Sequence, residues 1–235
     1  MSFIEKQWKL IFGAFAAILV VGLVIVITTS AKLSNEKKSQ ENFFLIEKKY
    51  SDYKTKKAQA AQPANPKEEK VKPVADFAAE LVAIKKSFAD FLSQDSNSKA
   101  GQMAALYYSE ILLEEKNKDL AKTTLLKAQN NDSGLVNTLV QQQLGQVLAD
   151  LDLCNEAIAI WQKVIDRKEA SFLHNEIKIQ QALCYQKTND SKKAEEILTN
   201  IANQKSDGPA AGESATAKEA AKYLRLIQYK KVSGT

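Results

Sequence analysis

A long apolar run near the start of the chain limits what this sequence can fold into more than any other feature. Residues 10–27, LIFGAFAAILVVGLVIVI, contain no charged side chain, and the next charge is Lys32. About 20 helical residues, each rising about 1.5 Å, cross the hydrocarbon core of a bilayer. We therefore expect a short tail over residues 1–9 and a transmembrane helix over residues 10–31.

A cleaved signal peptide is the competing interpretation, but its apolar region is normally about 7–15 residues long. The run here is longer, and TTS before Ala31 is a weak cleavage site. The lysines that flank the run bear on its orientation in the membrane, and they are more numerous after the run than before it. Taken alone, that count places the C-terminal part in the cytoplasm, although the rule weakens for long translocated domains.

Two segments separate the apolar run from the rest of the chain. Residues 32–61 are charged and helical in pattern, with an apolar stripe at Phe43, Ile46, Tyr50 and Tyr53. We expect this juxtamembrane helix to continue out of the membrane, its stripe resting on lipid headgroups or on a partner. Residues 62–75 hold three of the four prolines and are expected to form a semi-stiff linker. A folded domain is then expected over residues 76–232.

The composition favours an all-α fold whose charges are spread over its surface. Among 235 residues there are only 8 glycines and 4 prolines, whereas helix-forming residues are abundant. The net charge of +5 comes from lysines interleaved with glutamates, and Arg167 and Arg225 are the two arginines. Nucleic-acid binding favours arginine on a focused basic face, so we expect no nucleic-acid partner.

One pattern recurs with a period of 36 and then 37 residues. A small residue on one helix is followed 12 residues later by an alanine and 4 residues after that by a bulky residue. A small residue lets the second helix approach closely, and the bulky residue fills the remaining space. The predicted repeat-packing residues are Ser109, Ala121, Leu125, Gly145, Ala157, Trp161, Ala182, Ala194 and Leu198.

Each copy of the pattern predicts two paired helices, a helical hairpin. A single hairpin leaves one apolar face uncovered, so successive copies stack. We expect repeats over about residues 99–132, 133–169 and 170–207 and a capping helix over 212–231. The expected N-caps of the second helices are Asp119, Asn155 and Ser191.

The second repeat, LGQVLADLDLCNEAIAIW, resembles the tetratricopeptide repeat at Leu144, Gly145, Ala157 and Trp161. Its units are longer than the usual 34 residues of that repeat by two or three, and the closing proline is absent. The resemblance implies a short helical-hairpin solenoid whose first helices line a concave protein-binding groove. The groove positions carried over are Leu106, Glu110, Leu113, Gln142, Gln146, Ala149, Ile179, Leu183 and Gln186.

The layout of one N-terminal membrane helix, a charged stalk and about three degenerate repeats resembles the bacterial YfgM family. That resemblance implies an ancillary subunit of the SecYEG translocon, anchored in the inner membrane. It also implies a periplasmic repeat domain that meets emerging chains and periplasmic chaperones. The alternative is a repeat scaffold for the assembly of another cell-envelope complex.

The sequence shows no set of reactive groups that would converge for catalysis or metal binding. His174 is the only histidine, and it is expected to be a surface or capping residue. The glycines are scattered and form no phosphate-binding loop. We therefore expect no enzyme activity, no cofactor, no metal and no small-molecule substrate.

The two cysteines, Cys154 and Cys184, leave two possibilities open. In an oxidising compartment they could pair if their Cα atoms come within about 7 Å. Otherwise they are separate thiols, with Cys184 buried and Cys154 partly exposed.

Overall fold

The structure, a computed structural model, describes residues 3–61, 76–132, 134–204 and 214–233, and all the regular secondary structure in them is helical. This confirms the all-α prediction. The helices are α1 (Phe3–Ala60), α2 (Phe77–Gln94), α3 (Lys99–Glu114), α4 (Lys118–Ala128), α5 (Leu135–Asp150), α6 (Cys154–Ile165), α7 (Ser171–Lys187), α8 (Ser191–Ala202) and α9 (Ala215–Ser233), with a 3-10 turn η1 (Lys168–Ala170) before α7. The expected linker over residues 62–75 lies outside the described residues.

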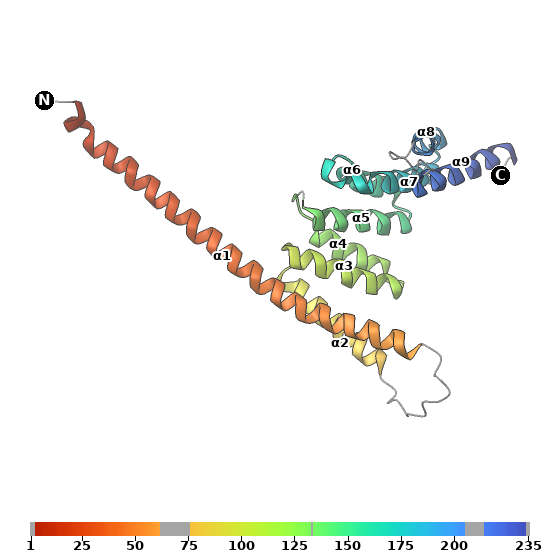
Figure 1. The fold of residues 1–235 in the computed structure, drawn as a ribbon, viewed down its shortest axis with the longest axis horizontal. Coiled ribbons are helices and arrows are strands. Elements are labelled where there is room, and N and C mark those ends of the chain that lie inside the picture. The colour runs from red at the N-terminus through yellow and green to blue at the C-terminus, as the bar shows by residue number, and fades with distance from the viewer. Residues whose placement is uncertain (1–2, 62–75, 133, 205–213, 234–235) are drawn as a thin grey trace.

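The helices form a stack in which each one packs against the next along the chain (Figure 1). The odd-numbered helices α1, α3, α5, α7 and α9 also contact one another in succession. Helices α3 and α4, α5 and α6, and α7 and α8 form three hairpins joined by short turns. This arrangement buries the apolar stripe that a single helical hairpin would leave facing water.

The α5–α6 hairpin is held together by a small residue that faces a large one. Gly145 of α5 lies against the indole of Trp161 on α6, and a Cβ atom at position 145 would overlap that ring. The nine repeat-packing positions of the sequence pattern are all buried. Close approach between paired helices therefore depends on the absence of a side chain at Gly145.

The turns inside the three hairpins share one backbone geometry. Lys116, Asp152 and Asn189 adopt positive φ angles of 62°, 59° and 64°. In each turn the next residue donates its backbone N–H to a carbonyl five residues earlier, at 2.8–2.9 Å, which is the Schellman arrangement.

This tight turn moves the helix starts relative to the expected N-caps. Asp119, Asn155 and Ser191 lie inside their helices, and the N-cap positions are Asn117, Leu153 and Asp190. The prediction was wrong because each second helix begins immediately after the positive-φ residue and its successor.

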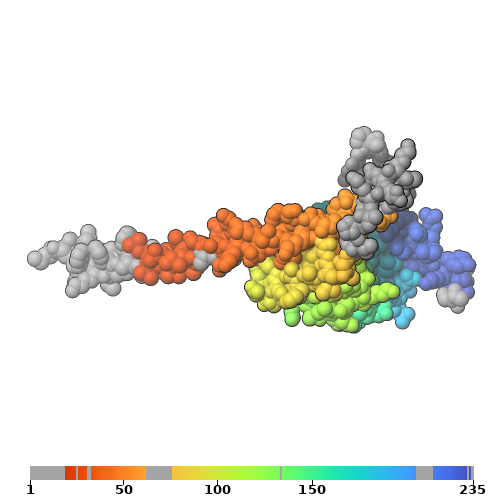
Figure 2. All heavy atoms as spheres, turned by 90° about the horizontal axis from the view of Figure 1, so that it is seen from below, coloured from red at the N-terminus to blue at the C-terminus, as the bar shows by residue number. Residues whose placement is uncertain are grey.

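The second half of α1 belongs to the folded stack. Its stripe was expected to meet lipid headgroups or a partner, but it packs on α2 and α3 (Figure 2). Ring centroids lie 6.4 Å apart for Phe43 and Phe91, and 6.1 Å apart for Tyr50 and Phe88. Residues 32–61 are therefore the first helix of a further hairpin rather than a separate stalk.

The partner of this segment, α2, continues the register of the second helices. Its Ile84, Phe88 and Phe91 stand 37 residues before Ala121, Leu125 and Ala128 of α4. Aromatic rings on both helices replace the small–large pairing of the other hairpins. These rings form an aromatic cluster of Phe43, Tyr50, Tyr53, Phe77, Phe88, Phe91, Tyr107 and Tyr108.

One carboxylate joins the first three helices. Asp95, at the end of α2, accepts hydrogen bonds from the hydroxyl of Ser39 on α1 and from the Ser98 hydroxyl at 2.7 Å and backbone N–H at 3.1 Å. Burial raises the pKa of Asp95, but these hydrogen bonds outweigh it and hold the pKa below its ordinary value. Ionised Asp95 therefore fixes α1 at the point where it enters the stack.

The first half of α1 projects away from the other helices (Figure 1). By length and composition, the part of this helix from Leu19 to Ala60 is long and apolar enough to cross a membrane. Between residues 19 and 27 its described large apolar side chains are exposed, since no other helix covers them: Leu19, Val20, Val21, Leu23, Val24, Val26 and Ile27.

Gly145→Ala should lower the free energy of unfolding by about 1–3 kcal/mol, because the new methyl group must displace the buried indole of Trp161. Urea unfolding of the full chain in detergent, followed by circular dichroism, measures this loss. Gly22→Ala is the matched control, since a Cβ there meets no atom within 4 Å. Equal stability of the two variants would contradict the assigned packing.

Asp95→Ala should lower the free energy of unfolding by about 1–3 kcal/mol, because two serine hydroxyls and a backbone N–H lose their acceptor. The folded-state pKa of Asp95 is depressed, so its contribution is present above the unfolded value and is lost as pH falls through the folded pKa. The stability difference from wild type should therefore shrink below about pH 3.9. Asp90→Ala, which removes an exposed pair with Lys86, should change stability by less than about 0.5 kcal/mol.

Candidate functional site

A concave pocket of about 510 Å³ lies over α3, α5 and α7. Equivalent positions on the three helices line it: Met103, Leu139 and Glu176 form one row, and Tyr107, Gln143 and Gln180 form another. Successive members of each row are 36 and 37 residues apart, as the repeat requires. The remaining lining residues are Leu106, Glu110, Gln142, Gln146, Trp161 and Ile177.

The floor of the concave pocket is apolar. Leu139, Ile177 and the largely buried indole of Trp161 form it. Trp161 donates its Nε1–H to the backbone oxygen of Gln142 at 3.1 Å, so its only polar atom is satisfied. It lies in the hairpin core, where the sequence pattern places it, and one part of its surface also meets the pocket.

Most of the polar side chains that line the pocket carry amide or carboxylate groups. Gln142 donates to Glu176 at 3.4 Å, and Gln146 donates to Asp150 at 3.1 Å. Within the described residues, the side chains of Gln143 and Gln180 make no hydrogen bond, so their amides are available to a ligand.

The nine predicted groove residues fall into two groups. Leu106, Glu110, Gln142 and Gln146 line the concave pocket. The others lie outside its lining: Leu113, Ala149, Ile179, Leu183 and Gln186. Ile179 is buried against the cluster of α8 and α9 instead.

The pocket is therefore centred about one helical turn nearer the N-termini of α3, α5 and α7 than the resemblance implies. Sequence reasoning missed Met103, Tyr107, Leu139, Gln143, Glu176, Ile177 and Gln180. The sequence signal for these lining residues was the two rows of equivalent positions, which recur with the same period as the packing residues.

Tyr107 belongs to both the concave pocket and the aromatic cluster that holds α1. Its ring centroid lies 6.0 Å from those of Phe43 and Tyr50. Burial, followed by the nearby charges of Glu47 and Glu110, raises the pKa of Tyr107, which keeps the phenol neutral. One side chain thus contacts α1 and the site at the same time.

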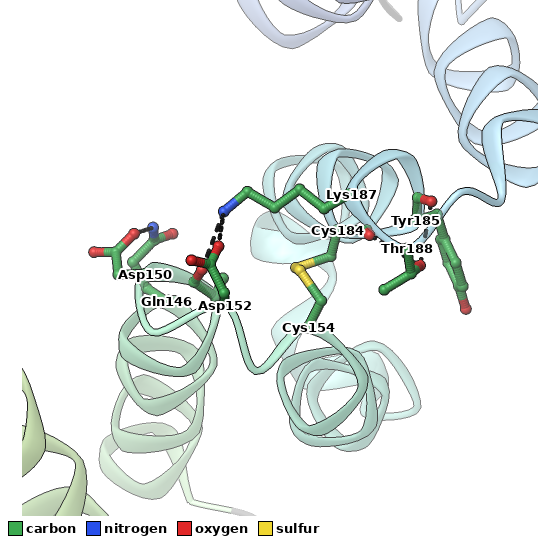
Figure 3. The surroundings of a disulfide bond; sticks show 9 residues. Gln146, Asp150, Asp152, Cys154, Cys184, Tyr185, Lys187 and Thr188 are labelled. Atoms are coloured by element: carbon green, nitrogen blue, oxygen red, sulfur yellow. Dashed lines mark hydrogen bonds and ion pairs between the residues drawn. A yellow bond between two sulfur atoms is a disulfide. The ribbon is translucent and has the colours of Figure 1, made fainter.

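A disulfide between Cys154 and Cys184 joins the second hairpin to the third (Figure 3). The two Cα atoms are 5.1 Å apart, and both residues are buried, so the alternative of a partly exposed Cys154 is wrong. Beside it, Lys187 pairs with Asp152 at 2.8 Å, and hydrogen bonding from Lys187 lowers the pKa of Asp152. The disulfide fixes α7, one wall of the concave pocket, relative to α6.

Among the described residues, no group of three or more His, Cys, Asp or Glu side chains lies close enough together to hold a metal ion. His174 is half-buried, and its Nε2 lies 3.0 Å from the backbone oxygen of Arg167. It therefore contacts the loop before α7 and lies outside the concave pocket.

No protein-family model matches this chain, and no curated protein matches it significantly. A function must therefore be argued from the concave pocket, the apolar helix and the disulfide. The concave pocket lies in the stack, and the apolar segment lies in the part of α1 that projects from it. The second half of α1 joins the two, because it packs on α2 and α3.

Replacing both cysteines, Cys154→Ser with Cys184→Ser, should lower the free energy of unfolding by about 2–4 kcal/mol, because the unfolded chain loses a closed loop. Urea unfolding with and without reductant tests this. Wild type should lose stability on reduction, whereas the double variant, as its own control, should not respond. A wild type that is indifferent to reductant would contradict the assignment.

Proposed function

We propose that this chain is a membrane-anchored scaffold that binds segments of other proteins through a tetratricopeptide-like stack of helical hairpins. The observation that carries the proposal is the lining of one pocket by equivalent positions of three successive hairpins. Stacked hairpins commonly present such a continuous concave surface to a ligand. The lining of apolar, amide and carboxylate groups suits a polypeptide, which offers side chains and backbone amides together.

Helix α1 supplies the membrane anchor in this proposal. The part of the helix from Leu19 to Ala60 is long and apolar enough to cross a bilayer, and its second half is built into the stack. The described apolar side chains between residues 19 and 27 are exposed. Because the helix is continuous over Phe3–Ala60, the concave pocket is held at a fixed position relative to the bilayer.

The disulfide supports a domain on the oxidising side of the membrane. Disulfides persist in the periplasm and are rare in the cytosol, where thiols are kept reduced. Because Cys154 and Cys184 are bonded, we assign the repeat domain to the periplasmic side of a bacterial inner membrane. This assignment takes precedence over the lysine count, which weakens for long translocated domains.

The partner that we propose rests on the resemblance of this layout of anchor and repeats to the YfgM family. We assign the chain to the surroundings of the SecYEG translocon, as an ancillary subunit that meets emerging chains and periplasmic chaperones. The lining of the concave pocket offers no nucleophile paired with a base, so we assign binding and no catalysis.

Photo-crosslinking in intact membranes tests the proposed function. A photoreactive residue replacing Gln143, inside the concave pocket, should give adducts with other polypeptides that mass spectrometry identifies. The matched control replaces Gln162, an exposed glutamine on α6 outside the pocket. Adducts at Gln143 with translocon subunits or emerging chains support the proposal. Equal labelling from both positions would contradict a binding role for the pocket.

A further inference from the structure

We infer that the segment bound in the concave pocket is cationic and apolar, with a lysine or arginine next to a large hydrophobic side chain. This inference rests on the proposed function and adds the chemistry of its ligand. It follows from three features of the pocket: the sign of its charges, their positions and the nature of its floor.

The charged side chains that line the concave pocket are both acidic. Glu110 comes from α3 and Glu176 from α7, and both are exposed. Among the described lining residues there is no lysine or arginine. This contrasts with the whole chain, whose net charge is +5. The pocket is thus a local acidic site on a basic protein, which attracts cationic segments and repels anionic ones.

Glu110 and Glu176 come from α3 and α7, the outer two of the three helices that carry the rows, and the apolar floor comes from α5, α6 and α7. Helix α5 crosses the middle with Leu139 and the glutamines, while Trp161 and Ile177 complete the floor. A hydrophobic side chain can enter this floor while a neighbouring cation reaches Glu110 or Glu176. The Gln142 amide already donates to Glu176 at 3.4 Å, which orients that carboxylate within the pocket.

The unpaired amides explain how the backbone of the segment would be held. Gln143 and Gln180 make no hydrogen bonds within the described part of the chain and lie in one row of the lining. Each amide both donates and accepts, so it can pair with the backbone of an extended segment whatever its sequence. Specificity then comes from the floor and the carboxylates.

A second copy of this chain is the competing occupant. The outer face of α9 carries Lys222 and Arg225 beside the exposed Leu226 and Tyr229, so it shares the inferred chemistry. Docking α9 of one copy into the concave pocket of another would join unlike surfaces, which generates open chains of molecules unless a ring closes. We therefore assign the pocket to a segment of a different protein and make self-association an outcome of the test.

Fluorescence anisotropy with the full chain in a non-ionic detergent tests the inference. The probes are two labelled peptides of the same length, one alternating lysine with leucine and the other alternating glutamate with leucine. We expect the lysine peptide to bind at least about tenfold more tightly at low salt, with the difference shrinking as salt is added. Glu110→Gln with Glu176→Gln should weaken the lysine peptide by roughly tenfold, at about threefold for each exposed carboxylate. Glu156→Gln, which removes the same charge from exposed α6 surface, should leave binding unchanged.

Three results would overturn the inference. Equal binding of the two peptides, or binding that the paired glutamate variant does not weaken, would remove the charge preference while Gln143 crosslinking still supports the proposed function. Binding of neither peptide, together with no adducts at Gln143, would reject both the inferred ligand chemistry and the proposed function. Self-association that Arg225→Glu abolishes would assign the concave pocket to a second copy.

Discussion

An amphipathic helical hairpin has an apolar face that it cannot bury by itself, and every other feature of this structure depends on that constraint. The α3–α4 hairpin is covered on one side by α1 and α2, and on the other by α5. At the far end, α9 packs on α8 and, to a smaller extent, on α7. The concave pocket exists because the odd-numbered helices meet in succession, which brings side chains of α3, α5 and α7 to one surface.

The same constraint gives α1 two roles. Between residues 19 and 27 its described apolar side chains are exposed, whereas its second half supplies aromatic side chains that pack against α2 and α3. Ionised Asp95 fastens the helix at Ser39, where it enters the stack. Tyr107 then extends the contact surface of α1 to the wall of the concave pocket. The anchor and the site are therefore parts of one packed body.

The repeat period could be read from the sequence because it rests on small–large pairs such as Gly145 and Trp161, which sequence spacing reveals. The packing of α1 in the stack could not be read from the sequence. Tyr50 and Phe88 pair by ring contacts, and the proline-containing segment interrupts the repeat period. The predicted groove positions and the concave pocket differ by about one turn along α3, α5 and α7, and Ile179 packs against α8 and α9 outside the pocket lining. Sequence left the pairing of Cys154 and Cys184 open, since a 30-residue separation does not fix the distance between two Cα atoms.

Amide hydrogen exchange of the full chain in detergent tests most directly whether α1 is part of the stack. The account predicts that amides of residues 40–57 exchange as slowly as those of the buried face of α3 and open together with them, because both require the aromatic cluster to separate. Exchange of residues 40–57 at the rate of an exposed helix, while α3 stays protected, would contradict it. The second half of α1 would then be a stalk, and the concave pocket would not be held in place by the membrane helix.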